Sequence, residues 1–404
     1  MKYRNNNLYV ENINIRSLSN KISTPFYCYS FDRIKNNINE FKKNFSKINP
    51  LICFSVKSNN NLNILKIIKN FGLGADVVSK GELLRALKAG IKPQKIVFSG
   101  VGKTPDEISF AIQKKILLIN AESENELKTI QKIAYKKKKK IDVGLRLNPN
   151  IDAKTLRKIS TGRNEDKFGI SDKNFVKLLK KFHNSKNINI KCLSVHIGSQ
   201  ILDYRPYSKM VSVIDNIIKK TKYKFDYIDL GGGMGIDYHS NSKKLNYKKY
   251  SIVIKNFLKK HKVKIIFEPG RSIIGNTGSL ISKVIYVKSS SKKNFVILDS
   301  AMNDFMRPAL YGSYHRIIPA IKNNTVIKKI HDFVGPICET TDSFLSLKKY
   351  QKVNENDVLA ICDTGAYGIV LASNYNLRTK PAEIMINKSN FKVISKKENI
   401  NKIA

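Results

Sequence analysis

The chain has 404 residues, 42% of them hydrophobic and 9% aromatic, which fits a globular protein of two domains and excludes a disordered chain. Its 74 basic and 31 acidic residues give a formal net charge of +43, which raises the question of nucleic-acid binding. Because 62 of the basic residues are lysines spread along the chain, whereas contacts to phosphates and bases favour arginine, we expect no specific nucleic-acid partner.

Short β-rich segments alternate with longer amphipathic segments from about residue 25 to residue 271. Eight candidate strands lie at 51–56, 75–78, 95–98, 116–119, 142–147, 190–195, 226–230 and 263–267. Helical patterns lie between them, at 62–70, 81–89, 122–138, 172–182, 205–220 and 247–260. Because parallel strands need long crossovers, the alternation indicates a parallel sheet, and eight strands favour a closed (β/α)8 TIM-like barrel.

The pattern changes after about residue 272. Strands without regular helices between them are predicted at 280–287, 294–298, 325–334, 358–363 and 382–386. They indicate a C-terminal, mainly antiparallel β domain, to which the segment 7–22 is expected to add a strand. The predicted fold class is therefore α/β plus β, with an N-terminal barrel at 25–271 and a β domain made of 1–24 and 272–404.

The cellular setting follows from what the sequence lacks. No apolar run approaches the roughly 20 residues of a membrane span, and no apolar segment follows the N-terminus as in a signal peptide. The five cysteines are scattered, odd in number and without CxxC spacing, which indicates reduced thiols instead of disulfides or a zinc site. We therefore expect a cytoplasmic protein with no membrane partner and no metal.

Polar motifs follow four of the predicted barrel strands, where barrel enzymes place their sites. Lys57 ends strand 1, where an apolar setting can lower the pKa of an amine and make it a nucleophile toward aldehydes. His196 follows strand 6, the triplet 231–233 (GGG) follows strand 7, and 268–271 (EPGR) follows strand 8. Glycines after strands 7 and 8 are typical of a phosphate site. Taken singly, each motif has an ordinary structural interpretation: Lys57 is a solvated charge, His196 a histidine of the core, and GGG a flexible turn.

These motifs, together with others, give the chain a resemblance to a known family. The set is VKSNNN, HIGSQ, LGGGMGIDY, FEPGRSI, RPALYG, GPICETTD and DTGAYG, in that order and over nearly the whole chain. It resembles the diaminopimelate decarboxylases, which are pyridoxal-phosphate enzymes related to alanine racemase and ornithine decarboxylase. The resemblance implies a barrel followed by a β domain, a homodimer, and the decarboxylation of meso-2,6-diaminopimelate to L-lysine and CO2, the last step of lysine biosynthesis.

The resemblance also implies roles for individual residues. Lys57 would carry pyridoxal 5'-phosphate covalently, His196 would stack on its ring, and Glu268 would hold the pyridine nitrogen protonated. The cofactor-binding residues would be Lys57, His196, Ser199, Gly232, Gly233, Glu268, Pro269, Gly270, Arg271 and Tyr367. The substrate-binding residues would be Arg271, Arg307, Tyr311, Glu339 and Tyr367.

Two neighbouring residues of the β domain are implied to reach the active site of the other subunit. Cys338 would be catalytic and donate the proton that replaces CO2, while Glu339 would pair with the distal amino group of the substrate. Without the family context Cys338 would read as a small buried apolar residue. Glutamate after the cysteine favours diaminopimelate, since relatives that form diamines typically carry aspartate there.

Two positions depart from the family pattern. Lys80 stands where the family usually has a glycine, and Leu156 stands where it usually has a histidine, inside the segment 153–167 that we expect to be a mobile loop near the site. Two alternatives to the leading prediction remain. One is an ornithine- or arginine-type decarboxylase on the same fold, and the other is a polyanion-binding protein with a retired enzyme fold.

Overall fold

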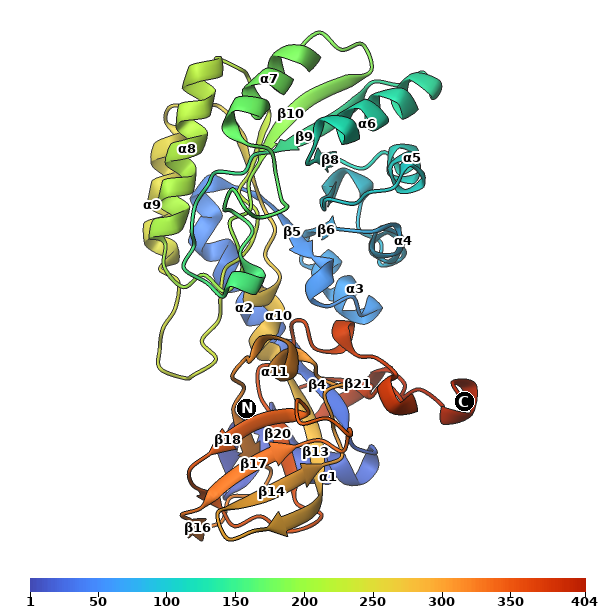
Figure 1. Ribbon diagram of the computed structural model, residues 1–404, viewed down its shortest axis with the longest axis vertical. Coiled ribbons are helices and arrows are strands. Elements are labelled where there is room, and N and C mark those ends of the chain that lie inside the picture. The colour runs from blue at the N-terminus through green and yellow to red at the C-terminus, as the bar shows by residue number, and fades with distance from the viewer. The chain divides into compact units, whose positions relative to one another are not determined.

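The computed structural model describes residues 1–404, apart from the side chain of Arg157. The chain divides into two compact units, and each is described by itself (Figure 1). The barrel unit comprises residues 39–236 and 243–272, and the β unit comprises residues 1–38, 237–242 and 273–404. Within the described part of the chain, no helix is both long and apolar enough to cross a membrane.

Eight parallel strands close the barrel, in agreement with the prediction, and each pairs with the next along the chain. They are β5 (Leu51–Ser55), β6 (Gly74–Val77), β7 (Ile96–Phe98), β8 (Leu118–Ala121), β9 (Ile141–Arg146), β10 (Ile188–Ser194), β11 (Tyr227–Asp229) and β12 (Lys264–Phe267). The last strand returns to the first through the register Ile266 to Leu51 and Phe267 to Ile52. The prediction was accurate because strands buried on both faces are short apolar runs that stand out in the sequence.

Helices follow the barrel strands and lie outside them (Figure 1). They are α3 (Leu62–Asn70), α4 (Lys80–Lys88), α5 (Pro105–Lys114), α6 (Glu124–Lys136), α7 (Asp172–Phe182), α8 (Arg205–Thr221) and α9 (Tyr247–Leu258). Three of them begin at a Ser or Thr that stands three residues before a glutamate, at Ser79, Thr104 and Ser123. In each case the hydroxyl accepts a hydrogen bond from the backbone N–H of that glutamate, so the start of the helix is set locally.

The longest part of the fold that the sequence prediction missed is α2 (Phe31–Phe45), whose polar composition hides its apolar face. Phe45 at its end is fully buried, and its ring centroid lies 4.6 Å from that of Phe267 in β12 and 5.8 Å from that of Tyr250 in α9. Contact with distant aromatic residues therefore holds the C-terminal end of this helix, beyond what local propensity supplies.

The β unit contains a nine-stranded, mostly antiparallel sheet, as expected for this part of the chain. Its strands are β4 (Phe26–Ser30), β13 (Gly278–Ser289), β14 (Lys293–Leu298), β15 (Ile317–Pro319), β17 (Ile330–Val334), β18 (Ser343–Leu347), β20 (Val358–Ile361), β21 (Ala382–Asn387) and β22 (Asn390–Ser395). A two-stranded sheet pairs β16 (Val326–Ile327) with β19 (Tyr350–Gln351). The short helix α10 (Arg271–Ile274) spans the boundary between the units just before β13, and α11 (Arg307–Tyr311) lies in the chain between β14 and β15.

The N-terminal segment forms a small sheet of its own, made of β1 (Lys2–Arg4), β2 (Asn7–Val10) and β3 (Ile13–Asn14), followed by α1 (Ile15–Lys21). It joins the β unit through its core, because Leu8 and Leu18 lie in one cluster with Ile281 of β13 and Ile384 of β21. The segment is therefore part of the β unit, while the strand that enters the large sheet from this end of the chain is β4.

The compact units differ from the predicted domains at the first boundary. We expected residue 25 to begin the barrel, but β4 pairs antiparallel with β13 and parallel with β21 and so belongs to the β unit. The first boundary consequently falls inside α2, between residues 38 and 39, whereas the later one falls at 272 to 273. Local sequence could not decide this, because an apolar strand has the same pattern in either sheet.

Candidate active site

Eight polar residues form a layer inside the barrel, one from each strand or from the residue directly after it. We call them the polar layer, which comprises Ser55, Asp76, Ser99, Asn120, Arg146, Ser194, Asp229 and Glu268. Two positions before them stand residues of an apolar cluster, Cys53, Val97, Leu118, Cys192 and Ile266 among them. Since side chains two apart on a strand point to the same face, the polar layer lies above this apolar cluster, toward the carboxyl ends of the strands.

Hydrogen bonds join the polar layer across the barrel. The Ser99 hydroxyl donates to Oε1 of Glu268 at 3.1 Å, although the two residues are 169 positions apart. Asn120 donates through Nδ2 to Oδ2 of Asp229 at 3.0 Å and to the Ser99 hydroxyl at 3.2 Å. The side chains of this layer are therefore fixed by one another in a buried setting.

Lys57, the predicted cofactor-bearing residue, follows β5 in a single turn of 3-10 helix (Val56–Ser58). Its Nζ lies 3.2 Å from Oδ2 of Asp76, which is fully buried and also accepts a hydrogen bond from the Ser55 hydroxyl at 2.8 Å. The Lys57 side chain itself keeps 37% of its surface exposed. The amine is thus held at the edge of the polar layer and remains accessible to a ligand.

Glu268 and Asp229 are neighbouring carboxyl groups in the polar layer, and they hydrogen-bond to each other. Burial raises the pKa of Glu268 well above its ordinary value, and the negative charges of Asp229 and Asp76 raise it further. Burial also raises the pKa of Asp229, against the opposing effect of hydrogen bonds that include one from the Gly231 N–H. The pair therefore keeps a proton at pH values where an exposed carboxyl group has lost it.

His196 follows β10, and its imidazole is neutral. The backbone N–H of Gly232 donates to Nδ1 at 3.1 Å, so the ring proton of a neutral imidazole lies on Nε2. Burial lowers the pKa of His196 well below its ordinary value, and the cations of Arg146 and Lys57 lower it further. A neutral aromatic ring held at one edge in this way is suited to lie against another flat ring.

The glycine triplet after β11 makes a turn that has no room for side chains. Gly231 and Gly233 have φ of +62° and +86°, in the left-handed region. A Cβ on Gly232 would lie 2.1 Å from the carbonyl oxygen of Glu268, and one on Gly233 would lie 2.2 Å from the carbonyl oxygen of Gly198. The turn after β11 thus packs directly against the segments that follow β12 and β10.

Two more of the predicted phosphate-site residues meet beside these segments. Arg271, at the start of α10, donates through Nη2 to the Ser199 hydroxyl at 3.1 Å, and its side chain is buried. Gly270 is equally confined, because a Cβ there would lie 2.9 Å from the Ser58 hydroxyl. The structure therefore brings together the residues predicted from the loops after strands 1, 6, 7 and 8.

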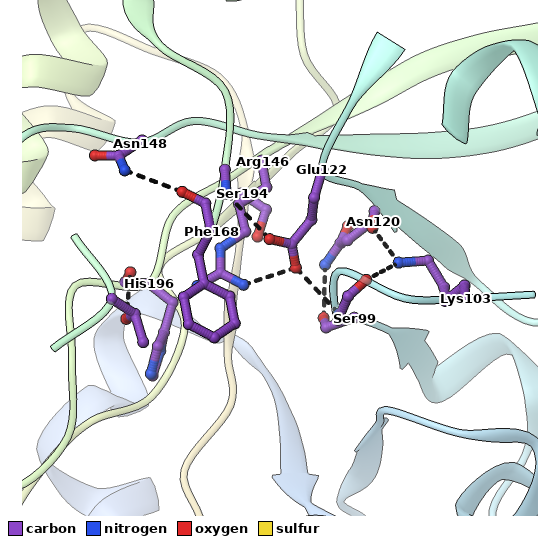
Figure 2. Close-up of polar contacts among 12 residues, drawn as sticks. Ser99, Lys103, Asn120, Glu122, Arg146, Asn148, Phe168, Ser194 and His196 are labelled. Atoms are coloured by element: carbon purple, nitrogen blue, oxygen red, sulfur yellow. Dashed lines mark hydrogen bonds and ion pairs between the residues drawn. The ribbon is translucent and has the colours of Figure 1, made fainter. Parts of the chain in front are cut away.

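A second cluster of the site, drawn in Figure 2, was not predicted from the sequence. Glu122 accepts through Oε1 from Nη1 of Arg146 at 2.8 Å and from the Gly100 N–H at 3.1 Å, and through Oε2 from the Gly169 N–H at 3.0 Å. The Arg146 guanidinium lies over the ring of Phe168, 4.9 Å from its centroid. One buried carboxylate thus holds the loops after β7 and β9. The signal available in the sequence was the period of two that places Arg146 on the inner face of β9.

The remaining predicted site residues lie in the β unit. Arg307 begins α11 and is buried, with Tyr311 at the end of the same helix. Cys338 and Glu339 are exposed, and the Glu339 carboxylate accepts hydrogen bonds from the Tyr375 hydroxyl at 2.5 Å and from Thr341 at 2.8 Å.

Tyr367 follows β20, and its backbone has a φ of 57°, in the left-handed region that few non-glycine residues adopt. The two departures from the family pattern are both on the surface. Lys80 pairs with Asp106 at 2.7 Å, and Leu156 is 54% exposed. Neither side chain is part of the polar layer.

Comparison with known proteins gives the class to which this fold and site belong. Residues 31–275 match the family model described as the pyridoxal-binding domain of pyridoxal-dependent decarboxylases. The chain is a member of that class, and its cofactor is pyridoxal 5'-phosphate.

Its relatives narrow the class further. The chain is 40% identical to the diaminopimelate decarboxylase of Aquifex aeolicus over 404 residues, which cover 99% of this chain and 95% of that protein. It is 42% identical to that of Helicobacter pylori, over 95% of this chain and 96% of the relative. The chain belongs to the diaminopimelate decarboxylase family.

Solved structures agree with this assignment. The chain matches diaminopimelate decarboxylase from Helicobacter pylori complexed with L-lysine at a TM-score of 0.90 and 40% identity, covering 96% of this chain and 97% of that one. It matches the enzyme from M. jannaschii, also in complex with L-lysine, at a TM-score of 0.94 and 33% identity, covering 100% and 96%. A lysine decarboxylase from Selenomonas ruminantium, at 20% identity, shares the fold.

Proposed function

We propose that this protein decarboxylates meso-2,6-diaminopimelate to L-lysine and CO2 with the help of pyridoxal 5'-phosphate. The observation that carries the proposal is the buried carboxyl pair of Glu268 and Asp229, in the same polar layer that holds Lys57 at its edge. Relatives at about 40% identity bear the name of this activity, and three of the similar structures contain its product, L-lysine.

The residues present fit the cofactor. Added Cβ atoms on Gly232 and Gly233 would meet the carbonyl oxygens of Glu268 and Gly198, so the turn needs glycine at both positions. A tight glycine turn after a late barrel strand is typical of a phosphate site. Pro269, Gly270 and Ser199 complete that cradle, and Tyr367 is assigned to it by family resemblance. Lys57 would hold the aldehyde carbon, and the neutral ring of His196 would lie against the pyridine ring.

The role of Glu268 follows from its pKa. Because burial and the neighbouring carboxylates raise that pKa, Glu268 has a proton to share with the nitrogen of a pyridine ring. Bound pyridoxal phosphate supplies a ring that accepts the electron pair left when CO2 departs, and it does so best when its nitrogen is protonated. Ser99 donates to Oε1 of Glu268, which fixes the orientation of the carboxyl group.

Charged and polar residues are proposed to bind the two ends of the substrate. Arg271, Arg307 and Tyr311 would bind carboxylate groups, the arginines through the paired N–H groups that suit them. Hydrogen bonds from Tyr375 and Thr341 lower the pKa of Glu339, so this exposed residue is a carboxylate suited to an ammonium group. Cys338 would donate the proton that replaces CO2.

The homodimer is part of the proposal. Cys338 and Glu339 are exposed on the β unit, which is the condition for two residues that serve the site of a second subunit. We place the enzyme in the cytoplasm, since none of the five cysteines is in a disulfide. We also keep the division into a cofactor-binding barrel and a β domain, with β4 counted in the latter.

The experiment compares substrates. CO2 release from meso-diaminopimelate, ornithine and arginine is measured with the purified enzyme supplied with pyridoxal phosphate, and we expect diaminopimelate to be strongly preferred. A preference for ornithine or arginine would overturn the substrate. Reduction with borohydride, followed by peptide mapping, is expected to place the pyridoxyl group on Lys57. A label on another lysine would overturn the assignment of the cofactor-bearing residue.

A further inference from the structure

Arg307 is held in the β unit by two uncharged side chains. Its Nη1 lies 2.9 Å from the hydroxyl of Tyr238 and 3.0 Å from Nε2 of His315. The guanidinium also lies over the Tyr238 ring, 5.0 Å from the centroid. All three side chains are buried. Both contacts limit the direction of the guanidinium, and neither of them is an ion pair.

The protonation state of His315 follows from its other ring nitrogen. Nδ1 lies 2.9 Å from the backbone carbonyl oxygen of Cys362, and a carbonyl can only accept. Nδ1 therefore carries the proton, which leaves Nε2 with a lone pair that accepts from Arg307. The ring is also confined edge-on by Phe305 and Tyr238, with centroids at 4.6 and 4.9 Å. The imidazole thus has one orientation and one tautomer.

We infer that His315 is a positioning residue for substrate recognition, which sets the orientation of the Arg307 guanidinium toward a carboxylate of the substrate. The inference rests on the proposed function, in which Arg307 binds such a carboxylate. Arginine recognises a carboxylate through two parallel N–H groups in a fixed plane, so a guanidinium that rotates loses most of its selectivity. His315 prevents that rotation through Nε2 and is itself held by the carbonyl of Cys362.

Two substitutions separate this role from simple packing. In His315→Gln the side-chain amide reaches the position of Nε2 and offers an oxygen to Arg307. In His315→Asn the shorter amide reaches the position of Nδ1, so it can still donate to the Cys362 carbonyl but offers nothing to Arg307. Both variants remove the ring, and they differ in the acceptor for Arg307.

The control is another buried histidine of the same unit. His331 in β17 is 2% exposed, with Nδ1 2.8 Å from the Lys329 carbonyl oxygen and Nε2 3.4 Å from Nδ2 of Asn294. Its setting therefore matches that of His315 except that no arginine is involved. His331→Asn measures the general effect of replacing a buried histidine in this unit.

The first readout is steady-state kinetics on meso-diaminopimelate. We expect His315→Asn to raise KM by roughly 10- to 100-fold, the range for a binding group displaced by about 1 Å, with a smaller change in kcat. His315→Gln is expected to recover most of the lost affinity, and His331→Asn to leave KM within about twofold of the wild type. Equal KM values for the Asn and Gln variants of His315 would overturn the inference.

The second readout is binding to the holoenzyme by calorimetry, without turnover. L-lysine keeps the distal carboxylate and cadaverine lacks it, so the ratio of their Kd values reports how well that carboxylate is held. We expect His315→Asn to reduce the ratio and His315→Gln to restore it. In an Arg307→Met background, His315→Asn is expected to have no further effect on the ratio, since the histidine acts through the arginine. An independent effect would overturn the inference.

Failure of the inference can be told apart from failure of the proposed function. If the wild type does not bind L-lysine more tightly than cadaverine, the proposed function fails. If it does, and His315→Asn leaves the ratio unchanged, only the inference fails. Should His315→Asn not fold, as judged by circular dichroism, Tyr238→Phe removes the hydroxyl that accepts from Nη1 of Arg307 and is expected to raise the KM for diaminopimelate several-fold. An unchanged KM there would overturn the inference that neutral acceptors position Arg307.

Discussion

The ammonium nitrogen of Lys57 lies 3.2 Å from Oδ2 of Asp76, and the hydroxyl of Ser55 donates to the same oxygen at 2.8 Å. Asp76 is fully buried, whereas more than a third of the Lys57 side chain is exposed. The Asp76 carboxylate therefore needs these two donors to compensate its buried charge. The Lys57 ammonium group needs the carboxylate less, because water can also solvate it.

This asymmetry predicts how the protein without cofactor responds to mutation. Lys57→Ala is expected to lower the free energy of unfolding by about 1 kcal/mol, the modest end for loss of a charge partner because solvent screens the exposed lysine. In an Asp76→Asn background the side-chain amide oxygen can still accept the hydrogen bond from the Ser55 hydroxyl. There, Lys57→Ala is expected to lower the free energy of unfolding by less. Urea unfolding of the four proteins in this cycle measures the coupling. Equal costs in both backgrounds would show that the pair contributes nothing.

The stability of the protein should fall as pH rises from about 5 to 7, in part because of Glu82. Burial raises the pKa of Glu82 to about 7, against the opposing hydrogen bond from the Val78 N–H. A carboxyl group whose pKa is higher in the folded than in the unfolded protein binds more protons in the folded state. Its contribution to the free energy of unfolding is therefore fully present below the unfolded pKa and is lost as pH rises through the folded pKa. Glu82→Gln keeps an oxygen for Val78 and is expected to flatten this dependence by up to about 3 kcal/mol.

Denaturant unfolding at pH 5, 6, 7 and 8, without cofactor, tests that prediction. Glu107→Gln is the matched control, because Glu107 also accepts backbone N–H groups near a helix start, those of Thr104 and Lys80. These hydrogen bonds lower its pKa although burial opposes them, so its contribution is already complete above pH 5. A profile for Glu82→Gln parallel to that of the wild type would contradict the assignment.

Mixing of subunits tests whether two chains build one site. Lys57→Ala and Cys338→Ala should each be nearly inactive as homodimers. After exchange of subunits, half of the dimers are mixed and each mixed dimer has one intact site, so activity should return to roughly a quarter of the wild-type value. Native mass spectrometry confirms that exchange has taken place. Mixed dimers without activity would mean that Lys57 and Cys338 act within one chain.

Selectivity for a substrate with two carboxylates should depend on Arg307. In the proposed function Arg307 binds a carboxylate of the substrate, so Arg307→Ala would leave that buried group without its partner. Such a loss typically costs about 2–5 kcal/mol, or roughly 30- to several-thousand-fold in kcat/KM. Cofactor binding, which is measured by the absorbance of bound pyridoxal phosphate, should be unchanged. Arg4→Ala, an exposed arginine of the same unit that bonds to Asn12, is the control. An unchanged rate on diaminopimelate for Arg307→Ala would remove this residue from the substrate site.

Much of the barrel could be predicted because its signals are local. Each buried strand is a short apolar run, and four of the eight are followed by a polar motif, which the barrel places at its carboxyl-terminal face. The start of α5 was equally visible, since Thr104 and Glu107 make a capping box, although the sequence prediction did not use it. The strand β4 was predicted to lie in the barrel domain from its position in the chain, but it pairs with β13 and β21 of the β unit. Which distant strands a segment pairs with is not visible in its local sequence.

The sequence by itself determined the alternation of strands and helices and the order of the motifs, and through the family they resemble it predicted which residues bind the cofactor. Only the tertiary structure decided which groups share a proton or fix one another. Ser99 reaches Glu268 across 169 positions and Asn120 reaches Asp229 across 109, contacts that exist only once the barrel has closed. A pKa depends on burial and on charges a few ångströms away, and neither can be derived from the spacing of residues along the chain.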